Sequence, residues 1–165
     1  RDLGVRGWDR AYGWGAVDVA AALREPEPLH DPLEPNDDIR WVSGRAGFAP
    51  DRPLLRRARR AEFAARLDLQ KDQFDIYPVW LAPGDTGTVT VTARDVHVDL
   101  YVWQPAARSA IGSSQVVTFS RRRGAARESV EFVNDAGRGL TGYVEVRGVR
   151  GGALGGTYRI TMTRR

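Results

Sequence analysis

The chain has 165 residues, enough for one ordinary domain or for a domain of about 130 residues with an appendage. Its 42% apolar and 28% charged residues are typical of a globular protein, and no apolar run approaches the ~20 residues of a transmembrane helix, so we expect no membrane partner. Because cysteine is absent, disulfides, a thiol nucleophile and a cysteine-ligated zinc site are excluded.

The net charge of +4 comes from arginine, since Lys71 is the only lysine. Two clusters concentrate this charge, "LRRARR" at 55–60 and "SRRRGAAR" at 120–127. A nucleic-acid site needs basic residues interleaved with aromatic residues that stack on bases, and neither cluster contains an aromatic residue. The clusters therefore indicate solvated loops, and we expect no nucleic-acid partner.

The chain begins with a short helical pattern that ends in a proline-rich segment. Ala16, Val19, Ala20 and Leu23 recur at helical spacing within "GWDRAYGWGAVDVAAAL" (7–23), which predicts one amphipathic helix. Four prolines fall within residues 25–35, and they deny backbone donors and favour an extended chain. We therefore predict a terminal segment at 1–24, a linker at 25–33 and a domain at 34–165.

After the linker the pattern is that of short strands. Alternating apolar residues are separated by turn sequences such as "APGDTG" and "NDAGRG", which predicts an antiparallel β-sandwich or jelly roll of about eight strands. Residues 62–69 favour a strand over a helix, and Pro78 predicts an edge position or a bulge because it cannot donate to a ladder. The clearest alternating segments are 89–93, 97–103, 129–133, 142–147 and 157–163.

Catalytic patterns are weak. The two histidines are His30, in the linker, and His97, which has Asp95 and Asp99 two positions away on either side. In a strand these three side chains share one face, and a solvated polar face explains that alternation without catalysis. The serines of "IGSSQ" lack the second glycine of a nucleophile elbow, so we do not expect this chain alone to be an enzyme.

One group of residues predicts a metal site. Glu34, Asn36 and Asp37 lie in "EPNDD", and Asp72 and Asp75 lie in "KDQFD". Five oxygen donors suit a hard cation such as calcium, whereas zinc or copper would favour sulfur or imidazole. The alternative is that the first segment is a turn and the second a solvated loop.

Residues 1–24 resemble the closing segment of the catalytic domain of subtilisin-like serine proteases. In that family a "YG-x-G-x-V-(D/N)-A-x-x-A-L" pattern ends the fold with a helix, and the catalytic Asp, His and Ser precede it. No catalytic residue can therefore be carried over, and Val19 stands where alanine is usual. The matching residues are Tyr12, Gly13, Gly15, Val17, Asp18, Ala22 and Leu23.

Residues 33–164 resemble the bacterial pre-peptidase C-terminal (PPC) domain, a β-sandwich appended to secreted proteases. The resemblance implies that the "EPND" opening and the Asp-x-x-Asp turn bind calcium together. It departs at Pro32, where an acidic residue is common, although Asp31 stands beside it. The motifs, in family order, are "EPNDD" (34–38), "DQFDIY" (72–77), "LAPGDTGTVTV" (81–91), "VHVDLYVW" (96–103), "TGYVEVR" (141–147) and "GTYRITM" (156–162).

Together the resemblances imply the non-catalytic C-terminal part of a secreted, extracellular subtilisin-like endopeptidase. The sandwich would stabilise or tether the protease domain that precedes it, as a monomer. An alternative is a module that binds collagen-like protein or cell wall, for which Trp41, Trp80 and Trp103 are candidates, although large aromatics in strands are more often core residues. The P domain of proprotein convertases, a jelly roll of similar size, is an alternative sandwich type.

Overall fold

The computed structural model describes residues 3–4, 10–13, 15–24, 33–44, 52–69, 71–112, 114–123, 127–151 and 155–165. Residues 25–32, which include most of the expected linker with His30, Asp31 and Pro32, lie outside the described residues. The domain limits predicted from sequence therefore stay a prediction.

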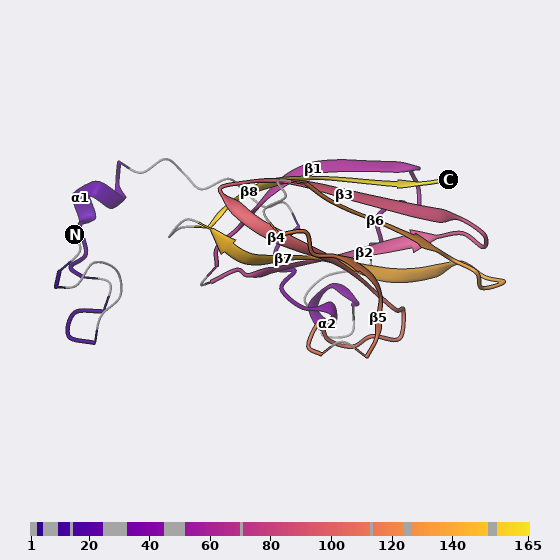
Figure 1. Cartoon of the computed structure of the whole chain (residues 1–165), viewed down its shortest axis with the longest axis horizontal. Helices are drawn as coiled ribbons and strands as arrows, with labels where there is room; N and C mark the ends of the chain where they lie inside the picture. The colour runs from indigo at the N-terminus through magenta and orange to yellow at the C-terminus, as the bar shows by residue number, and fades with distance from the viewer. Residues whose placement is uncertain are drawn as a thin grey trace.

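In the described part of the chain, eight antiparallel strands form two four-stranded sheets, so the predicted β-sandwich is confirmed (Figure 1). The first sheet has the order β1-β8-β3-β6 and the second the order β2-β7-β4-β5. Of these eight described strands, only β4 and β5 are consecutive members of one sheet, so the other connections pass from one sheet to the other. The strands are β1 Arg60–Leu67, β2 Phe74–Leu81, β3 Thr86–Arg94, β4 Val96–Trp103, β5 Val116–Ser120, β6 Arg127–Val133, β7 Leu140–Gly151 and β8 Gly156–Arg164.

The alternation of the sequence places one face of each sheet in a shared core. In β3, Val89 and Val91 are fully buried, while the alternating threonines at 88, 90 and 92 point the other way. Their partners across β8 include Ile160 and Met162, which are also fully buried. Residues 60–67 form a strand, as predicted, because pairing along the whole of β8 outweighs the local helical pattern.

Pro78 lies in β2, which is an edge strand, as predicted. The carbonyl of Pro78 accepts a hydrogen bond from Leu54 N (2.7 Å), and Trp80 N donates to Leu54 O (2.9 Å), on the side of β2 away from β7. The nitrogen of Pro78 faces the same way as its carbonyl, so the missing donor costs no bond of the β2–β7 ladder.

One local prediction was wrong, and one element was not predicted. Asp95 does not share a strand face with His97 and Asp99, because it occupies the turn between β3 and β4 with φ 65°, a conformation that Asp tolerates better than most residues. The element that was not predicted is the short helix α2 (Ile39–Val42), whose N-terminus is capped by the Asp38 side chain. Strong burial of Ile39 and Val42, rather than helical periodicity, holds this single turn in place.

The N-terminal segment contains the predicted helix, shortened to α1 (Val19–Ala22). Three apolar side chains in and beside it are open to solvent, with Val17 87%, Val19 63% and Leu23 83% exposed. A single helical turn is marginal on its own. Among the described residues, no helix is long and apolar enough to cross a membrane.

Glu145 is a fully buried carboxylate on the outer face of the second sheet. Trp103 Nε1 donates to it (2.7 Å), and so does Arg147 Nε (2.6 Å). Trp103 is only 2% exposed, so this tryptophan is a core residue, whereas Trp41 and Trp80 are half-buried. Burial raises the pKa of Glu145, and the nearby Arg147 opposes that rise without cancelling it.

We expect Glu145 to make stability depend on pH. Because its folded pKa is raised, its contribution to stability is fully present below the pKa of the unfolded chain, near 4.5, and is lost as pH rises through the folded value. The unfolding free energy of the wild type relative to Glu145→Gln should therefore fall as pH rises from below that value toward neutrality. Urea unfolding across this range measures it, with the exposed Glu131→Gln as control. A difference that stays constant with pH would contradict the assignment.

Candidate metal site

The segment that contains Glu34 and Asn36 runs beside the outer edge of β2. Ile76 N donates to Asn36 O (2.8 Å), using a backbone donor of β2 that points away from β7. This bond brings residues 34–38 next to residues 72–76, a proximity that the sequence alone did not establish.

A tight turn places Asp72 at the start of β2. Asp68 and Asp72 exchange two backbone hydrogen bonds of 2.9 Å each, which close the turn after β1. Gln73 then binds β7 twice, since its side chain donates to Gly148 O (2.9 Å) and its carbonyl accepts from Gly148 N (2.9 Å). The turn that carries Asp72 is therefore closed on itself and held against β7.

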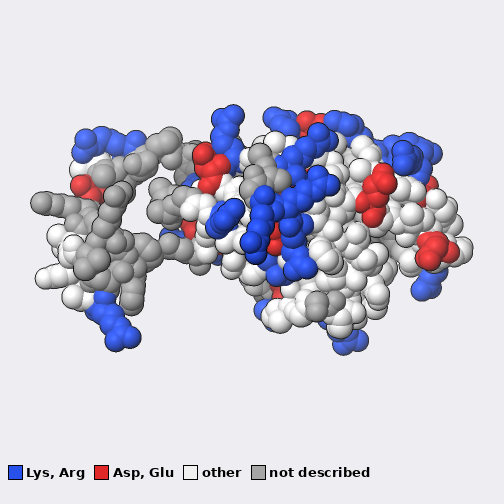
Figure 2. All heavy atoms as spheres, in the orientation of Figure 1, with Lys and Arg blue, Asp and Glu red and all other residues white. Residues whose placement is uncertain are grey.

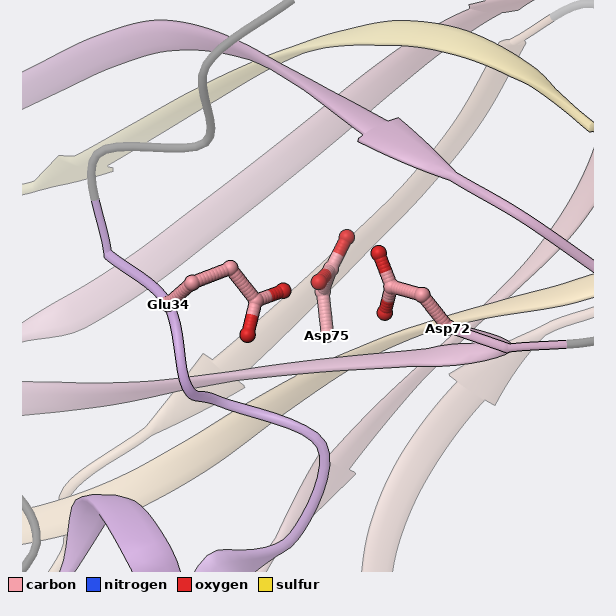
Figure 3. A group of neighbouring side chains, drawn as sticks. All are labelled: Glu34, Asp72 and Asp75. Carbon is pink, nitrogen blue, oxygen red and sulfur yellow. The ribbon is translucent and has the colours of Figure 1, made fainter. Parts of the chain in front are cut away.

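The carboxylates of Glu34, Asp72 and Asp75 converge at this edge, with one oxygen of each lying within 4.8 Å of the others (Figure 3). Their burial is graded, from exposed Glu34 through half-buried Asp72 to fully buried Asp75. Three carboxylates this close repel one another, and burial strengthens the repulsion. The arrangement favours a bound cation or a retained proton.

Asn36 lies beneath this group and is fully buried. Its side-chain oxygen faces Asp75 Oδ1 and Glu34 Oε1, and rotating the amide lets its nitrogen donate to them at 2.8 and 3.2 Å. The backbone N–H of Asn36 donates to Glu34 Oε2 (3.0 Å). Asn36 can thus present a donor to the carboxylates, or add a fourth oxygen to them when a cation is bound.

A pair of tyrosines fixes the inner oxygen of Asp75. Tyr158 OH donates to Asp75 Oδ2 (2.5 Å), and the hydroxyls of Tyr158 and Tyr77 hydrogen bond to each other. Burial, together with the nearby Tyr77 and Asp75, holds the pKa of Tyr158 well above 10. Tyr158 therefore stays neutral, and its proton remains available to the carboxylate.

Of the five predicted ligands, Glu34, Asn36, Asp72 and Asp75 come together, whereas Asp37 lies outside the carboxylate group. Its neighbour Asp38 serves another purpose, because it caps α2 and accepts a hydrogen bond from Ser109 (3.0 Å). Binding of a metal by any of these residues stays a prediction. The role of Tyr158 was not predicted, and its position two places after the last glycine pair gave no signal of it.

The donor set fits calcium in its chemistry. All four convergent side chains supply oxygen, and three are carboxylates. Calcium takes 6–8 oxygens, including backbone carbonyls and water, and accepts irregular geometry. The exposure of Glu34 leaves one side of the group open to solvent, which allows water to complete such a shell.

No family model matches the sequence, and no curated protein matches it. Among solved structures, the chain is similar to the pre-peptidase C-terminal domain of collagenase from Bacillus anthracis, with 13% identity and a TM-score of 0.47 over 64% of this chain and 88% of that one. It is also similar to PliG, a periplasmic inhibitor of g-type lysozyme from Aeromonas hydrophila, with 15% identity and a TM-score of 0.45 over 65% and 87%. A de novo designed double-stranded β-helix has 15% identity and a TM-score of 0.34 over 66% and 100%.

We predict that Tyr158→Phe destabilises the sandwich by about 1–3 kcal/mol, because Asp75 and Tyr77 both lose a buried hydrogen-bond partner. Urea unfolding of the whole chain measures the change. Tyr12→Phe is the matched control, since Tyr12 is 58% exposed, and it should change stability by less than about 0.5 kcal/mol. Equal, small effects of the two variants would show that the tyrosine pair does not support Asp75.

Proposed function

We propose that the chain is the non-catalytic C-terminal part of a secreted subtilisin-like endopeptidase, and that its PPC-like sandwich binds calcium. The observation that carries the calcium proposal is the convergence of Glu34, Asn36, Asp72 and Asp75 from two separate segments. The ordered motifs of residues 33–164 support the PPC-like assignment, and the pattern of residues 1–24 supports the parent protease.

Calcium at this position would bind where the chain enters the sandwich. Glu34 belongs to the segment that enters the domain, whereas Asp72 belongs to the turn before β2 and Asp75 to β2 itself. A shared cation would join the entering chain to the edge strand and replace carboxylate repulsion with attraction. This would fix the point at which an upstream domain is tethered.

The partial exposure of the proposed site is consistent with weak calcium binding. Extracellular calcium modules bind in the 10⁻⁴–10⁻³ M range, which suits a site that is open on one side. In this proposal the sandwich works as a monomer whose partner is the protease domain of the same protein.

We predict that calcium raises the thermal midpoint of the chain. A ligand that binds only the native state at 10 to 100 times its dissociation constant stabilises by about 1.4–2.7 kcal/mol, which is a rise of about 3–11 °C for a chain of this size. Glu34→Gln combined with Asp72→Asn should abolish most of the rise, because two of the three carboxylates lose their charge. Differential scanning calorimetry in calcium, in magnesium and in chelator measures the effect.

Asp135→Asn is the matched control, since this exposed carboxylate lies in the loop after β6, outside the group. It should keep the full calcium response. A midpoint that does not change over a wide range of calcium, or a response that survives the double substitution, would contradict the site. Asp37→Asn tests the remaining predicted ligand, whose loss lowers the response only if Asp37 binds the ion.

A further inference from the structure

The outer face of the β2-β7-β4-β5 sheet is divided into two parts. One part is covered by α2 and the loop after β4, where Ile39, Val42 and Ala107 pack on Ile76 and Tyr143. The other part carries arginine side chains stacked on aromatic rings, and we call it the arginine–aromatic row. The row consists of Phe74, Tyr101, Phe119, Arg121 and Arg147.

The row is built by contacts between neighbouring strands. The guanidinium of Arg147 lies 5.2 Å from the Phe74 ring centre and 4.6 Å from that of Tyr101. The guanidinium of Arg121 lies 4.2 Å from the Phe119 ring centre and 5.9 Å from that of Tyr101. Stacking holds each guanidinium in place, and Arg147 is held further because its Nε donates to Glu145. Arg121 forms no ion pair among the described residues, so its stacked guanidinium can bind an oxyanion at a lower entropy cost.

A depression of about 670 Å³ adjoins the row. Arg121, Arg123 and Arg150 at its walls are exposed, and among the described residues none of the three pairs with a carboxylate. Figure 2 shows lysine and arginine atoms gathered in the middle of the visible face, over β4 and β7. The depression is lined by His97, Asp99, Phe119, Arg121, Arg123, Val149 and Arg150.

The positive charge of the depression favours an anionic ligand. Two further features indicate which class of anionic polymer fits. Asp99 lines the same depression, where a carboxylate would repel a pure polyanion but accepts hydrogen bonds from hydroxyl groups. Phe119 is 51% exposed, whereas Tyr101 is only 9% exposed, so the row offers one open ring rather than a series of stacking platforms. Single-stranded nucleic acid needs several such platforms. To bind a sugar chain that carries acidic groups, a protein site needs one apolar surface for a sugar ring, an acceptor for the hydroxyl hydrogens and N–H donors for the acidic oxygens.

We propose that the depression beside the arginine–aromatic row binds an acidic polysaccharide. Arg121, Arg123 and Arg150 bind its acidic groups, Asp99 accepts hydrogen bonds from its hydroxyls, and Phe119 packs against a ring face. The site is separate from the carboxylate group at the edge of β2 and does not depend on calcium binding.

The test compares the affinity of the whole chain for dextran sulfate, unmodified dextran, poly-L-glutamate and oligothymidylate at one fixed ionic strength. Dextran sulfate should bind more tightly than the other three. Arg121→Ala combined with Arg123→Ala should weaken that binding about tenfold or more, since each charge-assisted hydrogen bond lost costs more than a neutral one.

Arg56→Ala combined with Arg57→Ala is the matched control. These exposed arginines line a second basic depression of about 980 Å³, whose described lining residues include no carboxylate and no aromatic residue. The control should leave dextran sulfate affinity within about twofold, although it removes the same charge. Equal losses in the two double variants would overturn the proposal, because they would show diffuse attraction to a basic protein.

Asp99→Asn separates hydroxyl recognition from charge attraction. Removal of a negative charge should tighten the binding of poly-L-glutamate and oligothymidylate, whereas the binding of dextran sulfate should weaken because the acceptor becomes poorer. Tighter binding of all three polyanions would overturn the role of Asp99. Oligothymidylate or poly-L-glutamate binding more tightly than dextran sulfate would overturn the polysaccharide and identify a nucleic acid or an acidic peptide instead.

Discussion

The buried carboxylate of Asp75 determines how this end of the sandwich is arranged, because its oxygens must be hydrogen bonded. A fully buried carboxylate is costly unless each oxygen has a partner. Tyr158 of the opposite sheet supplies a hydroxyl to one oxygen, and Asn36 of the entering segment faces the other. Asp75 therefore links both sheets to the entering chain.

The edge position of β2 makes this link available. An edge strand leaves alternate N–H and C=O groups unpaired, and such groups invite aggregation when they are exposed. Here Ile76 N is bonded to Asn36 and Pro78 O to Leu54, while Pro78 itself removes a donor. The bond that protects the edge at Ile76 is also the one that carries Glu34 toward Asp72. Edge protection and assembly of the carboxylate group thus share one backbone hydrogen bond.

The strands could be predicted from the sequence, but the order in which they pair could not. Period-two alternation identifies a strand such as β3 because Val89 and Val91 must be buried while their neighbours stay solvated. The pairing order could not be deduced, since all connections except β4 to β5 cross between sheets and no hairpin motif fixes their register. The helix α2 was missed because one capped turn, buried through Ile39 and Val42, has too few residues to show a period.

The candidate sites differ in what the sequence could predict about them. Glu34, Asn36, Asp72 and Asp75 occur in two short motifs, so residue chemistry and a family resemblance were enough to group them. The arginine–aromatic row has no motif, because its members come from four strands. The basic cluster at 120–127 contains no aromatic residue, although Phe119 precedes it directly and Tyr101 lies on the adjacent strand.

The carboxylate group and the arginine–aromatic row nevertheless share one strand, β2. Phe74 and Asp75 are consecutive in β2, so their side chains lie on opposite faces of the sheet. Asp75 points inward to Tyr158, and Phe74 points outward, where Arg147 stacks on its ring. The start of β2 must therefore hold a fixed register for both contacts to exist. Gln73, directly before Phe74, bonds Gly148 of β7 through its side chain and its carbonyl, so this residue holds the start of β2 against β7 and supports both the carboxylate group and the row.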